Sequence, residues 1–276
     1  EAEGMPRAAG MLRAIQLTQQ HRALSAGMLG GATAMEAPRQ AKQAEVERAL
    51  DKVAADSAAW PQIAAQVADV RSRWKSLAAA VAGRSLDGRQ SNAQHTALVS
   101  EELDALGRVV DAARLSMDPE PAIHHAADAV LQALPRLGET LGRMRAQGTT
   151  LLQQREATPP ERAQLASLAD SARMRRADVR HAFEQFALAD AAAAKASEAA
   201  LATALQAADQ ALALVDEKIV RAEKLDFAPG AYVAEMTRTI DAQFAVAQAA
   251  FGALDGMLTA RVAADSRDEI GQLLDA

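Results

Sequence analysis

The sequence predicts an all-α fold, on three observations. Half of the residues are hydrophobic but only 3% are aromatic, and alanine, leucine, glutamine, glutamate and arginine, which favour long helices, supply most of the chain. Alternating runs rich in valine, isoleucine and tyrosine, which would predict strands, are not evident. Alanine and leucine in a core let helix axes approach closely, so we expect an elongated antiparallel helical bundle.

Glycine and proline residues mark where the first two helices end. The first helix covers residues 5–29 and stops at Gly30 and Gly31, a pair suited to a left-handed C-terminal cap. The second runs over residues 36–82, where Pro61 must kink or divide it because proline removes a hydrogen bond and clashes with the preceding turn.

Prolines also bound the helices in the middle of the chain. A third helix covers residues 91–115 and ends before Pro119 and Pro121, and a fourth covers residues 122–155 with Pro135 inside it.

The fifth segment begins with a capping signal, since Thr158 precedes two prolines. No residue forces a stop between residues 161 and 225. A single helix of that length would be about 100 Å long, so we expect a bend within residues 187–194.

The last helix follows residues 226–230 and has the clearest amphipathic pattern of the chain. Its stripe consists of Val233, Met236, Thr237, Ile240, Phe244, Ala247, Phe251, Leu254, Leu258 and Val262. We expect two four-helix bundles stacked end to end on shared long helices; a single long bundle is the alternative.

Charge and motifs exclude several functions. A net charge of −6 and a pI near 5.5 argue against a nucleic-acid partner, which would need a basic face. The chain has no cysteine, so the redox compartment stays open, and no run of ~18 apolar residues would span a bilayer. Phosphate-binding loops, nucleophile elbows and zinc-protease motifs are missing, so we expect no enzyme and no cofactor.

Polar residues interrupt the core stripe of the first helix. This stripe consists of Ile15, Thr18, Gln19, Arg22, Ser25, Ala26 and Leu29, at three- and four-residue steps. Arg22 keeps its charge, so it must face water, a carboxylate of a neighbouring helix or a bound anion. Thr18, Gln19 and Ser25 add hydroxyl and amide groups that suit an anion. A salt bridge across the bundle is the equally weighted alternative.

Three segments, residues 17–27, 134–148 and 232–241, resemble the periplasmic sensor regions of bacterial methyl-accepting chemotaxis receptors. They are similar to the nitrate- and nitrite-sensing and helical bimodular types. The resemblance implies a dimeric helical sensor of two stacked bundles, anchored by a membrane span at each end. It also implies that the domain binds a small anion or organic acid and relays this binding to a cytoplasmic signalling module. Arg22 matches the arginine of the family pattern Glu-Arg-Gly-Leu-Ser, which reads His-Arg-Ala-Leu-Ser here.

Further candidate ligand residues lie in the other two segments. Arg143 and Arg145 follow Pro135, and residues two apart on a helix point in different directions, so only one should face inward; the family match favours Arg145. The Thr237 hydroxyl has two candidate partners, the carbonyl four residues earlier and a ligand. Tyr232, the single tyrosine, lies about one turn before Thr237, where packing alone would explain it.

Two other polar groups fit a solvated surface better than a site. His124, His125 and Asp128 lack a fourth ligand, so we expect no metal, although many relatives carry a Tyr-Tyr pair where this chain has the two histidines. Arginines at 173, 175, 176 and 180 alternate with acidic residues, as on a solvated helix face.

We therefore expect residues 1–276 to form a single extracytoplasmic sensor domain, the periplasmic part of an inner-membrane chemoreceptor. Helical periodicity runs close to both ends, from Met11 and up to Leu274, so the chain ends should form a membrane-proximal module and the middle a distal one. Binding should displace the last helix by ~1 to 2 Å. The alternatives are a ligand-free dimerisation or spacer module and a cytoplasmic scaffold.

Overall fold

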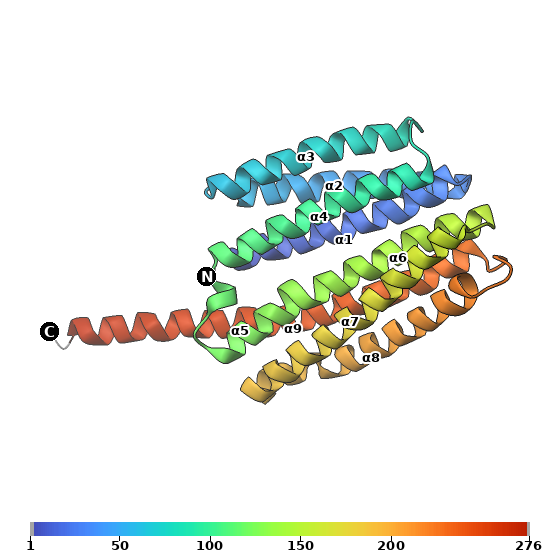
Figure 1. The fold of residues 1–276 in the computed structure, drawn as a ribbon. Coiled ribbons are helices and arrows are strands. Elements are labelled where there is room, and N and C mark those ends of the chain that lie inside the picture. Colours follow the sequence, from blue (N-terminus) through green and yellow to red (C-terminus); the bar gives the residue numbers. More distant parts are fainter. Residues whose placement is uncertain (1–2, 275–276) are drawn as a thin grey trace.

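The computed structural model describes residues 3–274 and confirms the all-α fold, with nine α-helices within these residues (Figure 1). They are α1 (Gly4–Leu29), α2 (Glu36–Asp56), α3 (Pro61–Ala82), α4 (Gly88–Ala112), α5 (Pro121–Asp128), α6 (Leu134–Gln154), α7 (Pro159–Ala189), α8 (Ala191–Val215) and α9 (Pro229–Leu274). One π-helical turn, Ala129–Ala133, joins α5 to α6, and another, Asp216–Val220, follows α8.

Local sequence signals set the helix ends. Gly31 follows α1 in the left-handed region with φ of 103°, as the glycine pair predicted. Thr158 and Glu161 form a reciprocal capping box at the start of α7. Asp190 separates α7 from α8 and its carboxylate accepts a hydrogen bond from the Ala193 backbone N–H. The break expected within residues 187–194 is therefore confirmed, and the chain reverses direction there (Figure 1).

The two internal prolines have different consequences. Pro61 begins α3 after a turn, so α2 and α3 form a helical hairpin. Pro135 is the second residue of α6, directly after the π-helical turn. The wider turn accommodates the missing N–H and the proline ring, so residues 121–154 continue as one helical run.

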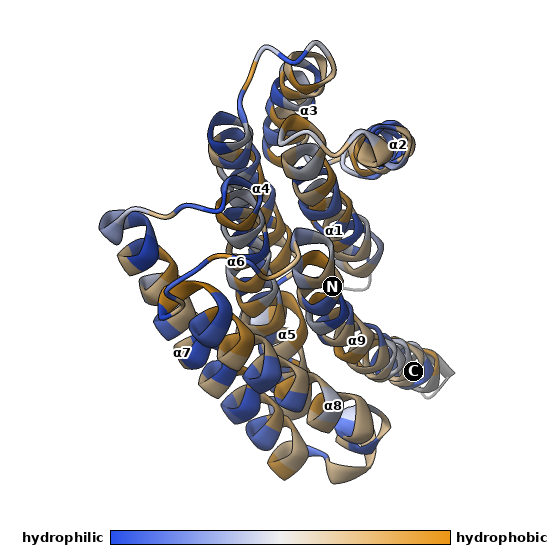
Figure 2. Ribbon diagram, turned by 90° about the vertical axis from the view of Figure 1, so that its right-hand side faces the viewer, coloured by the Kyte–Doolittle hydropathy of each residue, from blue (hydrophilic) through white to orange (hydrophobic). Residues whose placement is uncertain are grey.

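The helices form two groups, α1 to α4 and α5 to α9, that lie side by side (Figures 1 and 2). In the end view of Figure 2 the groups meet where α1 and α4 face α6 and α9. We expected the groups to be stacked end to end on shared long helices. The structure differs because the reversals after α2 and α7 return the chain alongside itself. Even α7, with 31 residues, is only about 47 Å long.

The last helix extends beyond the body of the molecule (Figure 1). Leu254 and Leu258 are still buried, whereas Val262 is 51% exposed. Arg261 anchors this part of α9 with a two-pronged ion pair to Asp118 at 2.9 and 2.8 Å. The start of α1 and the end of α9 lie toward the same end of the molecule. None of the described helices has the length and hydrophobicity needed to cross a bilayer.

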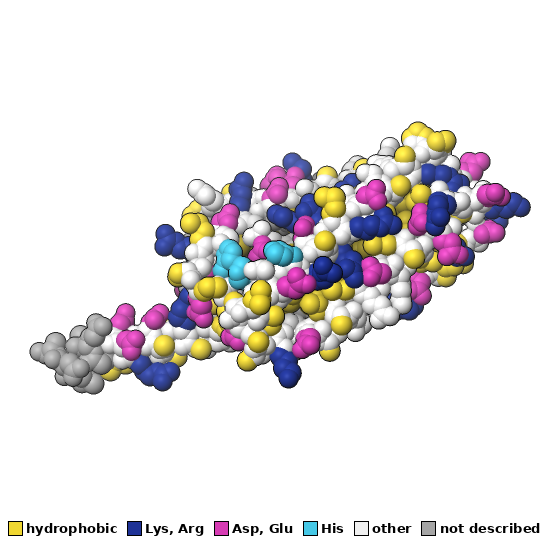
Figure 3. Space-filling model, turned by 60° about the horizontal axis from the view of Figure 1, so that its bottom comes forward, with side chains coloured by type: hydrophobic (Ala, Val, Ile, Leu, Met, Phe, Trp, Pro, Cys, Tyr) yellow, Lys and Arg dark blue, Asp and Glu magenta, His cyan; other side chains and the backbone are white. Residues whose placement is uncertain are grey.

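Charges of both signs are interspersed on the face shown in Figure 3. The arginines of α7 pair with acidic neighbours, as Arg173 with Asp170, Arg175 with Asp178 and Arg180 with Glu184. This arrangement confirms the solvated helix face that the alternating charges predicted.

Candidate functional site

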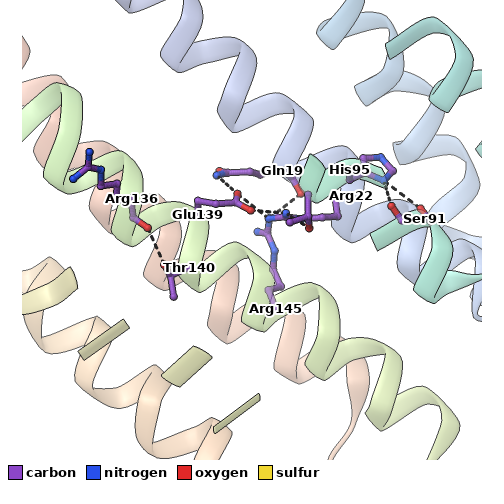
Figure 4. Close-up of polar contacts among 9 residues, drawn as sticks. Gln19, Arg22, Ser91, His95, Arg136, Glu139, Thr140 and Arg145 are labelled. Carbon is purple, nitrogen blue, oxygen red and sulfur yellow. Dashed lines mark hydrogen bonds and ion pairs between the residues drawn. The ribbon is translucent and has the colours of Figure 1, made fainter. Parts of the chain in front are cut away.

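A buried polar cluster lies where α1, α6 and α9 meet, between the two helix groups. We call it the arginine cluster, and it consists of Gln19 and Arg22 from α1, Glu139 and Arg145 from α6, and Thr237 from α9. Figure 4 shows the α1 and α6 side chains of this cluster converging. Both arginines are almost completely buried, with exposed fractions of 0% and 2%.

Arg22 and Glu139 form a two-pronged ion pair. Nη1 of Arg22 lies 2.7 Å from Oε1 of Glu139, and Nη2 lies 3.2 Å from Oε2. Gln19 Nε2 donates a third hydrogen bond to Oε2 at 3.0 Å, and Nη1 of Arg22 also donates to the Thr96 hydroxyl at 3.0 Å. The side chain of Glu139 is 12% exposed while that of Arg22 is inaccessible, so the acid is the member of the pair nearer to water.

Arg145 is held by neutral groups only. Its Nη1 donates to the Thr237 hydroxyl and its Nη2 to the backbone carbonyl of Gln19, both at 3.0 Å. Burial, together with the positive charge of Arg22, lowers the pKa of Arg145 to about 10. Arg145 therefore stays charged at neutral pH.

The arginine cluster has an excess of positive charge. Among the described residues no carboxylate lies within ion-pair distance of Arg145, and Asp241 acts on it only from further away. Burial, and secondarily the charge of Glu139, raises the pKa of nearby Glu102 well above its usual value, which disfavours the charged form of this acid. Glu139 is paired with Arg22 alone, and Arg145 is acted on only from a distance, by Asp241 more strongly than by Glu139.

Both guanidinium groups keep an unused donor. The Nε–H groups of Arg22 and Arg145 are buried and have no hydrogen-bond partner in the described part of the chain. Buried donors without a partner are uncommon in proteins and call for an explanation. Together with the excess charge, they favour a small anion as the missing partner.

Glycines of α6 make room for the cluster. A Cβ atom at Gly142 would lie 2.6 Å from Nη2 of Arg22, and one at Gly148 would collide with the hydroxyl of Tyr232. That hydroxyl donates to the Met144 carbonyl at 2.6 Å. The small residues thus let α1 and α9 approach α6 closely.

Of the residues predicted as a site, Gln19, Arg22, Arg145 and Thr237 come together in the arginine cluster. Tyr232 lies beside them, fully buried. Arg143 is only partly buried and points into a different region.

Two predicted residues do not join the arginine cluster, because they project into the first helix group instead. Thr18 donates to Glu102 and lies within reach of the Ala14 carbonyl. The hydroxyl of Ser25 lies 3.3 Å from Nδ1 of His21. A stripe of three- and four-residue steps is wide enough to contact both helix groups, and α1 lies between them.

A second polar feature, the histidine chain, fills the interior of the first group. It consists of Arg39, His21, His95 and the backbone carbonyl of Ser91. Nδ1 of His95 donates to the Ser91 carbonyl at 2.8 Å, so its Nε2 accepts from Nδ1 of His21 at 2.8 Å. Nε2 of His21 then accepts from Arg39 at 3.4 Å. Burial is the main cause that lowers the pKa of His21 to about 2 and that of His95 to about 3.

Glu139 and the histidine chain were not among the residues predicted from the sequence. Glu139 precedes Gly142 by three residues, so the two lie near the same helix face, and this spacing was the available signal. His21 and His95 are 74 residues apart, and nothing local indicates their contact. In the described residues, no group of three or more histidine, aspartate or glutamate side chains is arranged to hold a metal.

A cavity of about 580 Å³ lies on the other side of α6, between α4, α6 and α7. Its lining includes Asn92, Thr96, Arg143 and Gln147. Because the Thr96 hydroxyl accepts from Arg22, the cavity comes within one side chain of the arginine cluster.

Comparison with known families identifies the domain. A family described as nitrate and nitrite sensing matches residues 13–255, which is most of the chain and includes both arginines of the arginine cluster. This chain belongs to the nitrate- and nitrite-sensing family. No curated protein sequence matches it significantly.

The fold of this family member also matches a solved structure. The NasR transcription antiterminator superposes with a TM-score of 0.74 at 18% sequence identity, over 94% of this chain and 69% of the other. At this identity the likeness shows the fold alone. The family match shows a sensor domain. It does not show that the domain belongs to a chemotaxis receptor, which was the narrower expectation from the sequence.

Proposed function

We propose that this chain is the ligand-binding domain of a signalling protein and that it binds nitrate or nitrite at the arginine cluster. The observation that carries the proposal is Arg145, a buried cation with no carboxylate partner among the described residues. Nitrate and nitrite are small planar anions whose oxygens match the side-by-side donors of a guanidinium group. An anion there would neutralise the excess charge and use the free Nε donors.

The same contacts connect the site to α9. Arg145 binds Thr237 near the start of α9, and Tyr232 fixes that end to α6. A ligand that pulls Arg145 toward itself changes these contacts, and only such a difference between two states can shift a signalling equilibrium. We expect α9 to move by about 1 to 2 Å and to carry the signal out of the domain along its projecting end.

We further propose that the domain belongs to a dimeric chemotaxis receptor and lies outside the cytoplasm. The support is the resemblance of three segments to such receptors, together with the start of α1 and the end of α9 lying toward the same end of the molecule (Figure 1). The sequence on either side of these 276 residues tests this context. Two flanking apolar spans of about 20 residues are expected; their absence would assign the domain to another kind of signalling protein.

One observation favours the alternative of a ligand-free spacer. That hypothesis required Arg22 to pair with an internal acid, and Arg22 does pair with Glu139. It also predicts that no polar cavity interrupts the stripe of the first helix; it gives no role to Arg145, a buried cation without a carboxylate at ion-pair distance among the described residues. The two functions therefore differ at Arg145, which binds an anion in a sensor and has no ligand in a spacer.

Calorimetric titration of the chain with nitrate, nitrite and chloride decides between them. We expect nitrate or nitrite to bind, and Arg145→Met to weaken binding at least 30-fold, the loss of one charge-assisted contact of about 2 kcal/mol. Arg180→Met is the matched control, because Arg180 is exposed on α7. Absence of binding by the unaltered chain, or equal binding by Arg145→Met, would contradict the proposal.

A further inference from the structure

Glu139 occupies a position that an anionic ligand would use. Its carboxylate accepts three hydrogen bonds, two from Arg22 and one from Gln19. Carboxylate and nitrate are both planar, with oxygens that share one delocalised charge, and each accepts parallel hydrogen bonds from a guanidinium group. The side chain of Glu139 therefore imitates the ligand at Arg22 (Figure 4).

From these contacts we propose that Glu139 is a built-in competitor, which holds Arg22 in the unliganded domain and is displaced when nitrate or nitrite binds. This inference rests on the proposed function and concerns the regulation of the same site. It predicts that the unliganded state is stabilised by the ion pair and that the ligand exchanges with a tethered carboxylate.

The structure provides a place for the displaced carboxylate. Arg143 follows Glu139 by four residues on α6, the spacing and order at which glutamate and arginine pair on a helix surface. Arg143 makes no ion pair within the described part of the chain, and its Nε is buried without a partner. A rotation of the Glu139 side chain along α6 would move it from the buried Arg22 to Arg143.

Space for this movement lies beside α6. The cavity between α4, α6 and α7 is lined by Arg143 and by Thr96, the hydroxyl that accepts from Arg22. A second hollow between α4 and α6 is lined by Gln132 and Arg136. Glu139 falls between these two sets of positions on the α4-facing stripe of α6. The side chain of Glu139 is partly exposed, whereas that of Arg22 is not. This difference agrees with a Glu139 side chain that moves toward the cavity beside Arg143.

Because one carboxylate has two arginine partners, Arg22 and Arg143, Glu139 acts as a two-position switch. In one position Glu139 links α6 to α1 through Arg22; in the other, the bound anion takes over Arg22 and Glu139 stays on the surface of α6. Because the ligand must displace Glu139, its apparent affinity is lower than its affinity for a free Arg22. The factor is the equilibrium constant by which the ion pair favours the unliganded state. Removing the carboxylate should therefore raise affinity, whereas removing an ordinary ligand-binding residue lowers it.

Nitrate titration of the unaltered chain, Glu139→Gln and Arg143→Met tests the switch. We expect Glu139→Gln to bind nitrate at least tenfold more tightly, because the amide has no charge with which to compete for Arg22. We expect Arg143→Met to bind severalfold more weakly, because the displaced carboxylate loses its alternative partner. Glu184→Gln is the matched control and should leave affinity unchanged, since Glu184 is exposed on α7.

The outcomes separate this inference from the proposed function. If the unaltered chain binds nitrate and Glu139→Gln binds it equally or less tightly, the competitor is refuted while the sensor function stands. If neither protein binds nitrate or nitrite, both proposals fail. Glu139→Asp keeps the charge on a shorter side chain and covers the case in which Glu139→Gln does not fold; it should bind nitrate more tightly than the unaltered chain, and equal or weaker binding would also refute the competitor.

Discussion

The histidine chain and the arginine cluster are two buried polar regions that differ in how their charges are balanced. In the histidine chain each ring nitrogen has a partner, both rings are neutral, and Arg39 pairs with Glu36 at 3.1 Å. In the arginine cluster Glu139 pairs with Arg22, and Arg145 has no carboxylate at ion-pair distance among the described residues. The charges of the first region are balanced within the chain, although Nε of Arg39 has no hydrogen-bond partner among the described residues, whereas Arg145 in the second region has no ion-pair partner among them.

The difference separates structural from functional polar groups. A buried network whose donors and charges are all satisfied rigidifies and specifies the fold. A network left with an unpaired cation and free donors lowers stability, so its presence at the meeting point of α1, α6 and α9 favours a role in binding. Four measurements test the comparison.

The largest difference is expected between Arg22→Met and Arg145→Met in the absence of nitrate. Arg22→Met leaves Glu139 without its partner, so the free energy of unfolding should fall by about 3 to 5 kcal/mol. Arg145→Met removes a cation that has no partner, so the change should stay within about 1 kcal/mol. Urea denaturation measures both values. Equal destabilisation by the two variants would mean that Arg145 is a structural group like Arg22.

The histidine chain should make the fold sensitive to acid. The folded-state pKa of His95, about 3, lies below that of the unfolded chain, so the unfolded state binds the proton first and stability falls as the pH drops from about 6.5 toward 3. The loss attributable to this residue is about 1.4 kcal/mol per pH unit.

Urea denaturation between pH 6.5 and 4.5 measures this loss. The slope of stability against pH should be shallower in His95→Gln by that amount, while the exposed His181→Gln should keep the slope of the unaltered chain. An unchanged slope in His95→Gln would show that His95 is already charged in the fold.

Two glycines of α6 offer a matched pair of substitutions in the arginine cluster. Gly142→Ala places a methyl group 2.6 Å from the guanidinium of Arg22, which is fixed by Glu139, and should cost about 1 to 3 kcal/mol. Gly138→Ala meets nothing within 4 Å and should gain about 0.5 to 1 kcal/mol from helix propensity. Thermal denaturation compares them, and a shift of the same sign in both would argue against a tightly held Arg22.

The smallest effect is expected at Glu102, which lies between the two polar regions. Its folded-state pKa is raised by burial, so its charge opposes folding once the pH exceeds the unfolded value. Glu102→Gln should therefore raise the free energy of unfolding by about 1 kcal/mol at pH 7. The gain should disappear near pH 4, where the acid is protonated in both states. A loss of stability at pH 7 would show that Glu102 is ionised and paired.

Residues that act locally were predictable. The glycine pair after α1, the capping residues Thr158 and Glu161, and Pro61 all lie within a few residues of the helix ends that they set. The inward orientation of Arg22 followed from the three- and four-residue spacing of α1. The prediction of an end-to-end arrangement was wrong because the sequence signals do not show in which direction the chain leaves each turn.

The partners of the buried charges were not predictable. Arg22 and Glu139 are 117 residues apart, and Arg145 and Thr237 are 92 apart. Patterns within one helix show which face is buried but not which residue of another helix it meets. Thr18 and Ser25 illustrate this limit, since they share the stripe of Arg22 yet face the first helix group.

The amino-acid sequence by itself determined the helices of this protein, their ends and the residues that face inward, because hydrogen bonding and side-chain periodicity within a helix are local. Only the tertiary structure decided that the helix groups lie side by side and that Glu139 pairs with Arg22 and not with Arg145. Electrostatic pairing depends on distances between helices, which packing of the whole chain sets, and this packing leaves Arg145 without a carboxylate at ion-pair distance among the described residues.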